Sequence, residues 1–294
     1  MRGMGLRIVD PVRTGESRLA CGRLLGWAEW GPPDGIPVLL CPGAATSRRL
    51  GFGADVVDAL GVRLISVDRP GLGASTPVPG RSFGDFAADI REFTACRDIG
   101  RPAMVGHSQG APFALACAAE GVVGALAVVS GADEVAAPEF AGLLPAQLRA
   151  LVARTVAAPA GAEEFFAAFD PGAMWEMVLA GSAESDRQVY REPGFERAYR
   201  RALDEAFAQG PAGYARDTVL AMGRWTFDPA RITVPVDVWY GEQDASHSPD
   251  QGAFLADRVP GAVRRLVPDV GGAVLWTHAE EILRSLTENL LARR

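Results

Sequence analysis

The amino-acid sequence predicts an α/β fold, a mostly parallel sheet with helices on both faces. Continuous apolar runs such as "IPVLLCPG" (36–43) and "PAMVGHSQG" (102–110) lack polar alternation, which is typical of strands buried on both faces. Helical stretches separate these runs along the chain. With 294 residues, of which 48% are hydrophobic, the chain is long enough to bury a sizeable core.

The first elements are a hairpin, two strands and a helix. Residues 18–31 hold short apolar stretches broken by glycine, which predict the hairpin, and "GPPDG" (31–35) predicts a turn after it. Buried strands are expected at 36–43 and 62–68. The following helix is predicted to be capped by Ser82 and to bury a face made of Phe86, Ile90 and Phe93.

The strand pattern is interrupted once in the second half of the chain. Strands are expected within residues 102–107, 123–133, 233–244 and 262–272, and a final amphipathic helix has Ile282, Leu286 and Leu290 on one stripe. Between these strands, aromatic-rich helical segments replace the strand signal. We therefore predict a core of residues 1–133 and 231–294, with residues 134–230 inserted as a helical cap.

Charge and composition exclude several classes of function. The net charge of −7 argues against nucleic-acid binding, because phosphate backbones attract clustered positive charge. All 29 basic residues are arginine, as is typical of GC-rich bacterial genomes, so Schiff-base lysines and the lysine of phosphate-binding loops are excluded. We expect a small-molecule substrate and a monomeric or homodimeric protein.

Cysteine spacing and hydropathy favour a cytoplasmic protein. The cysteines lack the C-x-x-C spacing of zinc or redox sites (Cys21, Cys41, Cys96 and Cys117). The stretch "MRGMGLRIVDP" lacks the apolar core of a signal peptide, and no segment reaches the roughly 18 apolar residues of a membrane span. We therefore expect no metal, no cofactor and no membrane association.

The sequence "GHSQG", residues 106–110, carries the clearest chemical motif. It matches G-x-S-x-G between a predicted strand and a predicted helix, which is the context of a nucleophile elbow. A tight strand-turn-helix strains the serine backbone, and the glycines leave room for that turn. We predict that Ser108 is a nucleophile; the alternative is an ordinary serine in a glycine-bounded helix cap.

With two further motifs, the sequence resembles the α/β-hydrolase fold family over nearly the whole chain. "DRPGLGAS" (68–75) is similar to the loop after that family's fourth strand, and "LLCPGAATSR" (39–48) to its oxyanion loop. The resemblance implies an eight-stranded sheet and a serine hydrolase. It also implies that the backbone N–H groups of Ala44 and Gln109 stabilise the oxyanion of a tetrahedral intermediate.

The acid of the implied triad is Asp244. It follows a predicted buried strand in "WYGEQDASHSP", in the chain order serine, acid, histidine. A carboxylate there orients a histidine and stabilises its imidazolium. The alternative for Asp244 is a turn aspartate, and Asp133 is the reserve candidate for the acid.

The base of the implied triad is missing. In "DVGGAVLWTHAEEIL", Ala273 stands where the family places its catalytic histidine. His278 lies five residues too late and corresponds to a helix-start histidine, and His107 is expected to be structural. His247 lies on the rim of the predicted site, where service as the base would need an unusual geometry.

Three accounts of Ala273 remain open. The first is a deliberate His-to-Ala change at 273 in an ester, lactone or thioester hydrolase, which would leave the chain nearly inactive. The second is a natural protein of this fold that binds a ligand or performs lyase or cyclase chemistry. The third is hydrolysis with His247 as the substitute base.

The predicted cap offers apolar residues as walls for a moderately hydrophobic substrate. Our candidates are Met174, Trp175, Met177, Met222 and Trp225. Residues of this kind also pack helices together, which is the alternative for each of them.

Overall fold

The computed structural model describes residues 8–293 and contains one eight-stranded sheet. The spatial order is β1-β2-β4-β3-β5-β6-β7-β8. Its strands are β1 (Arg13–Arg18), β2 (Leu24–Trp30), β3 (Ile36–Cys41), β4 (Val62–Val67), β5 (Ala103–His107), β6 (Ala125–Val129), β7 (Val236–Gly241) and β8 (Val263–Val267). The pairs β1-β2 and β2-β4 are antiparallel and all the others are parallel, which confirms the predicted mostly parallel sheet.

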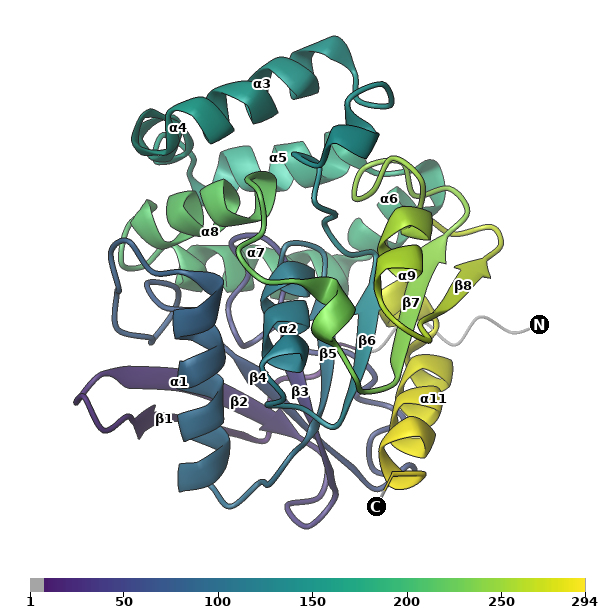
Figure 1. Ribbon diagram of the computed structural model, residues 1–294. Coiled ribbons are helices and arrows are strands. Elements are labelled where there is room, and N and C mark those ends of the chain that lie inside the picture. Colours follow the sequence, from purple (N-terminus) through teal and green to yellow (C-terminus); the bar gives the residue numbers. More distant parts are fainter. Residues whose placement is uncertain (1–7, 294) are drawn as a thin grey trace.

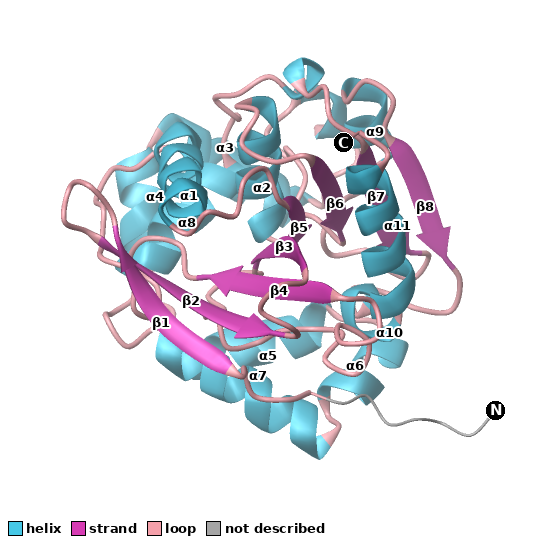
Figure 2. Ribbon diagram, turned by 90° about the horizontal axis from the view of Figure 1, so that it is seen from below, coloured by secondary structure: helices cyan, strands magenta, loops and turns pink. Residues whose placement is uncertain are grey.

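Helices cover both faces of the sheet (Figure 2). One apolar cluster joins the sheet to α1 (Phe83–Cys96), α2 (Gly110–Ala119) and α9 (Ala253–Arg258). A second cluster joins the other face to α10 (Val274–Thr277) and α11 (Ala279–Leu291). The sheet therefore lies between two helical layers, and its central strands are buried on both sides.

The local sequence explains where α1 begins. The Ser82 hydroxyl accepts a hydrogen bond from the Asp85 N–H, and the Asp85 carboxylate accepts one from the Ser82 N–H. This reciprocal capping satisfies two N–H groups at the start of the helix. Ser82 is thus the cap that the sequence predicts, and the predicted apolar face of α1 is buried.

A helical insertion separates β6 from β7. It consists of short 3-10 turns at Pro138–Phe140 and Pro229–Arg231 and of α3 (Ala146–Ala157), α4 (Pro159–Phe166), α5 (Pro171–Gly181), α6 (Glu184–Tyr190), α7 (Pro193–Ala206) and α8 (Ala212–Met222). In Figure 1 these helices lie above the ends of the central strands, with α3 and α4 farthest from the sheet. The division at residues 134–230 stays a prediction.

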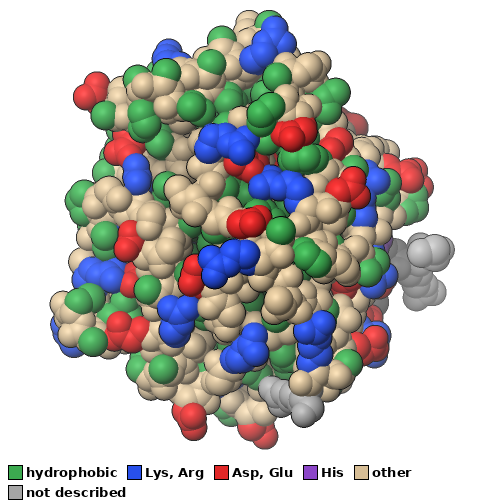
Figure 3. All heavy atoms as spheres, in the orientation of Figure 1, with side chains coloured by type: hydrophobic (Ala, Val, Ile, Leu, Met, Phe, Trp, Pro, Cys, Tyr) green, Lys and Arg blue, Asp and Glu red, His purple; other side chains and the backbone are tan. Residues whose placement is uncertain are grey.

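Basic and acidic side chains are interspersed over the face that Figure 3 shows. Within residues 8–293, no helix combines the length and the apolar character that crossing a membrane requires.

Candidate active site

Ser108 occupies a strained turn between β5 and α2. Its φ of 49° lies in the left-handed region, which non-glycine residues rarely adopt. A Cβ on Gly106 would lie 2.7 Å from the Ala114 Cβ, and one on Gly110 would lie 2.1 Å from the Cys41 carbonyl oxygen. Both positions therefore require glycine, and the partly exposed Ser108 has the backbone of a nucleophile elbow.

The loop after β3 approaches this serine closely. A Cβ on Gly43 would lie 3.3 Å from the Ser108 Cβ. Neither the Ala44 N–H nor the Gln109 N–H donates a hydrogen bond to any residue that the structure describes. The Gln109 side chain bonds elsewhere, its Nε2 donating to the Thr218 hydroxyl of α8 at 2.9 Å. Both predicted oxyanion donors are therefore available to a ligand beside Ser108.

Arg69 holds the Gly43 loop in place. Its fully buried guanidinium donates to the carbonyl oxygens of Pro42 and Gly43, the latter at 2.9 Å. Its Nε donates at 2.7 Å to Asp217 on α8, which also pairs with Arg81. Sequence reasoning missed this role, although an arginine directly after a buried strand is a signal that could have found it, because buried charges need partners.

Asp244 lies near the start of the loop after β7 and pairs with His247. The His247 Nδ1 lies 2.9 and 3.0 Å from the two oxygens of the buried Asp244 carboxylate. Burial alone would raise the pKa of Asp244, but the His247 imidazole and hydrogen bonds at the carboxylate hold that pKa below its usual value. The sequence placed His247 on the rim of the site but did not predict this contact with Asp244.

Asp133, the reserve candidate, contacts no imidazole. Its carboxylate accepts hydrogen bonds from the Ser248 hydroxyl at 3.0 Å and from the Glu134 N–H at 2.8 Å. Burial raises its pKa to about 6. The geometry therefore favours Asp244 as the acid.

Ala273 lies at the start of α10, in the loop after β8. It is fully buried in an apolar cluster. The N–H groups of Gly271, Gly272 and Ala273 all donate to the carboxylate of Asp186, at 2.8 to 3.0 Å. Asp186 belongs to α6, so a carboxylate of the helical insertion fixes the loop that carries Ala273.

The other two histidines differ in environment. His107 is buried edge-on against Trp276, with 4.8 Å between ring centroids, and burial lowers its pKa to about 3. It is therefore neutral at physiological pH. His278 contacts the Thr277 hydroxyl between α10 and α11. Neither contacts Asp244.

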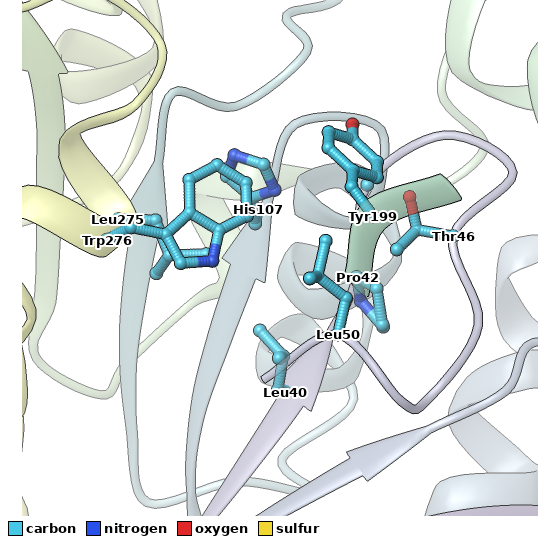
Figure 4. Close-up of a pocket in the computed structure, with 9 residues that line it drawn as sticks. Leu40, Pro42, Thr46, Leu50, His107, Tyr199, Leu275 and Trp276 are labelled. Atoms are coloured by element: carbon cyan, nitrogen blue, oxygen red, sulfur yellow. The ribbon is translucent and has the colours of Figure 1, made fainter. Parts of the chain in front are cut away.

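A small cavity lies beside the elbow (Figure 4). Its volume is about 10 Å³, roughly the space of one water molecule. Figure 4 shows His107 and Trp276 on one side and Tyr199 with Thr46 on the other. The lining is Leu40, Pro42, Gly43, Thr46, Leu50, His107, Tyr199, Leu275 and Trp276. Of these, only Tyr199 comes from the helical insertion.

The predicted wall residues do not line this cavity. Met174 and Trp175 are buried in the insertion, where Trp175 packs against Tyr199, and Met177 is 44% exposed. Met222 is half-buried against apolar clusters. Trp225 stacks on Phe227. Their role in substrate binding stays a prediction. Among the described residues, no group of His, Cys, Asp or Glu could hold a metal ion.

The chain belongs to the alpha/beta hydrolase family, whose model matches residues 38–284. Family membership supports a hydrolase-type role.

Individual relatives agree with this assignment. The "Putative non-heme chloroperoxidase" of Synechocystis sp. is 25% identical over 239 residues, covering 76% of this chain and 79% of that protein. The structure is similar to an esterase from Exiguobacterium antarcticum (TM-score 0.70, 16% identity, 95% of this chain and 99% of that chain). It is also similar to the enol-lactonase of Burkholderia xenovorans LB400 (TM-score 0.67, 21% identity, 94% and 100%). At such identities, the solved structures show a shared fold.

Proposed function

We propose that this protein is a serine hydrolase for an ester, lactone or thioester of a moderately hydrophobic small molecule. The observation that carries the proposal is the strained backbone of Ser108, held beside two unpaired backbone donors. Strain at a non-glycine residue persists only where the surrounding fold enforces it. Together with family membership, it supports Ser108 as the nucleophile.

In the proposed reaction the Ser108 Oγ attacks the substrate carbonyl carbon while a base takes its proton. The N–H groups of Ala44 and Gln109 stabilise the oxyanion of the tetrahedral intermediate. The base then gives the proton to the departing alcohol or thiol, leaving an acyl-enzyme. Water attacks this ester in the same way and releases the acid. Asp244 stabilises the charged base in both steps.

We propose that the base of the complete enzyme is a histidine at position 273, and that Ala273 is a His-to-Ala change. The intact elbow, acid loop and oxyanion loop support this. Alanine accepts no proton, so a chain with Ala273 and no other base should retain only roughly the 10³–10⁴-fold acceleration that binding and an oxyanion hole supply alone.

The apolar lining of the cavity supports an uncharged, moderately hydrophobic substrate. An acyl group does not fit into about 10 Å³, so binding requires the cavity to widen. Tyr199 is the lining residue on the helical insertion, and displacement of α7 would widen the cavity. The names of the esterase and lactonase relatives agree with this substrate class.

The second candidate is a ligand-binding protein, or a lyase or cyclase, that naturally lacks the histidine. It is favoured by the complete burial of Ala273 among apolar residues.

The test compares Ala273→His, with and without His247→Gln, against the parental chain. Nitrophenyl esters of varied chain length, lactones and thioesters serve as substrates, and Ser108→Ala is the control in each background. We expect Ser108-dependent turnover in at least one histidine form. Its absence from all of them across the three panels would overturn the hydrolase proposal and favour the ligand-binding candidate.

A further inference from the structure

We propose that His247 is the general base of this chain, so that acid and base both lie on the loop after β7. This inference rests on the proposed serine hydrolase. It adds that Ser108-dependent turnover in this chain uses His247 as the base and exceeds what binding and the oxyanion hole supply alone.

The pairing of His247 with Asp244 is the first observation. A triad histidine uses Nδ1 to bond the acid and Nε2 to take the serine proton. The Nδ1 of His247 faces both Asp244 oxygens at 2.9 and 3.0 Å. Its Nε2 has no hydrogen-bond partner among residues 8–293. With the proton on Nδ1, the lone pair of Nε2 is free to accept another.

The position of the imidazole is the second observation. A Cβ on Gly272 would lie 2.8 Å from the Cε1 of His247. The ring therefore covers the loop that normally supplies the base, and glycine at 272 makes room for it. Ala273, buried among apolar side chains, does not compete for Asp244.

The link between the acid loop and the elbow is the third observation. Ala132 N–H donates to the Ser108 carbonyl at 2.8 Å, and the adjacent Asp133 N–H donates to the His247 carbonyl at 3.3 Å. The two backbones are thus bonded to neighbouring residues of one segment. The ring of His107, next to Ser108 in sequence, lies 6.3 Å from the His247 ring between centroids. The loop that carries His247 is therefore anchored to the same segment as the elbow.

Several ionisable or polar groups face His247. They are the carboxylates of Asp244 and Asp186, the neutral His107, and the hydroxyls of Ser246 and Tyr190. Burial alone would lower the pKa of His247, but Asp244 and then Asp186 outweigh it and raise that pKa above its usual value. These carboxylates would stabilise the imidazolium that forms when the serine loses its proton.

In each step of the proposed reaction, the Nε2 of His247 accepts one proton and gives one back. In acylation, the proton of the Ser108 hydroxyl moves to Nε2 as Oγ bonds the carbonyl carbon, and it passes to the leaving oxygen or sulfur as that bond breaks. In deacylation, a water proton moves to Nε2 and returns to Oγ as the acyl-enzyme bond breaks. His247 ends each cycle neutral, with its proton on Nδ1.

The test replaces His247 by glutamine in the parental chain. We expect His247→Gln to lower Ser108-dependent ester turnover at least about tenfold, since general-base catalysis contributes 10²–10⁴-fold. His278→Gln, which removes a histidine outside the site, should leave it unchanged. Phosphonylation of Ser108 by a serine-directed fluorophosphonate, followed by mass spectrometry, gives a second rate that needs no turnover.

The pH profile separates a base from a structural residue. Because only neutral His247 accepts a proton, both rates should rise with pH through a midpoint above the ordinary histidine value of about 6.5. His247→Gln should remove this rise. Unchanged rates and an unchanged profile in His247→Gln would refute the proposal, as would a parental chain without Ser108-dependent reaction. In that last case, activity of Ala273→His combined with His247→Gln would still uphold the proposed hydrolase.

Discussion

The loops after β7 and β8 meet at the same edge of the sheet, yet they are built differently. The loop after β7 presents an acid and an imidazole three residues apart, already in contact. The loop after β8 presents only backbone N–H groups, bound by Asp186 of the helical insertion. The usual triad divides acid and base between these loops and depends on their alignment. A pair within one loop depends mainly on the local turn.

The largest effect should come from Asp244→Asn, which breaks the pair in the loop after β7. An amide cannot stabilise an imidazolium, and in a serine triad this kind of change costs about 10⁴-fold. We expect a loss of about 10³-fold or more in the chain that combines Ala273→His with His247→Gln, and a fall to the Ser108→Ala rate in the parental chain. The measurement is kcat/KM for a nitrophenyl ester.

Asp133→Asn is the matched control, because Asp133 is a buried carboxyl that contacts Ser248 and no imidazole. An equal loss in both variants would show that the Asp244 effect comes from general disruption of the fold.

Moving the base to the loop after β8 should give the next largest effect. Relative to the parental chain, Ala273→His combined with His247→Gln should raise kcat/KM about 100-fold, within the range of general-base catalysis. Ala273→His alone should gain less, because His247 competes for Asp244. If the single variant equals or exceeds the double variant, the two histidines do not compete.

Arg69→Met tests the oxyanion loop, which is needed whether the base is His247 or a histidine at position 273. It removes the donors to the Pro42 and Gly43 carbonyls, and misplaced oxyanion donors should lower kcat about tenfold. Breaking a buried pair should also lower the free energy of unfolding by about 3 kcal/mol. Denaturant unfolding gives the stability. Arg201→Met, which breaks the exposed pair with Asp10, should change neither quantity appreciably.

Asp186→Asn should give the smallest effect and sharpen the contrast between the loops. An amide accepts fewer hydrogen bonds from residues 271–273, so a base at 273 should slow about fivefold, equivalent to about 1 kcal/mol. Loss of the negative charge should also lower the pKa of His247 and move the parental pH midpoint downward. Glu184→Gln on the same helix is the control, and a midpoint that stays in place would contradict the electrostatic role of Asp186.

Sequence patterns predicted the features that local chemistry determines. Apolar runs marked the central strands, Ser82 marked the start of α1, and the glycines around Ser108 marked the elbow, because each signal lies within a few neighbouring residues. Asp186 gave no such signal. In "ESDRQVY" it resembles any acid on an exposed helix, and only the tertiary fold brings it to residues 271–273.

His247 and Tyr199 show two further limits of prediction from the sequence. Spacing placed His247 beside Asp244, but the direction of the ring depends on turn geometry and on the room above Gly272. Tyr199 lies in a segment predicted as helical, and helical periodicity alone does not say which face meets the core.

The ion pair between Asp217 and Arg69 ties α8 to the loop that carries Ala44. If α8 moves together with α7 when the cavity widens, this pair separates and the carbonyls of Pro42 and Gly43 lose their anchor. In the open enzyme the oxyanion loop would no longer be fixed in position. Return of α8 would re-form the ion pair and fix the loop again. The enzyme would then admit substrate only while the oxyanion donors are out of place. Ser108 would form an acyl-enzyme only after the substrate is fully enclosed.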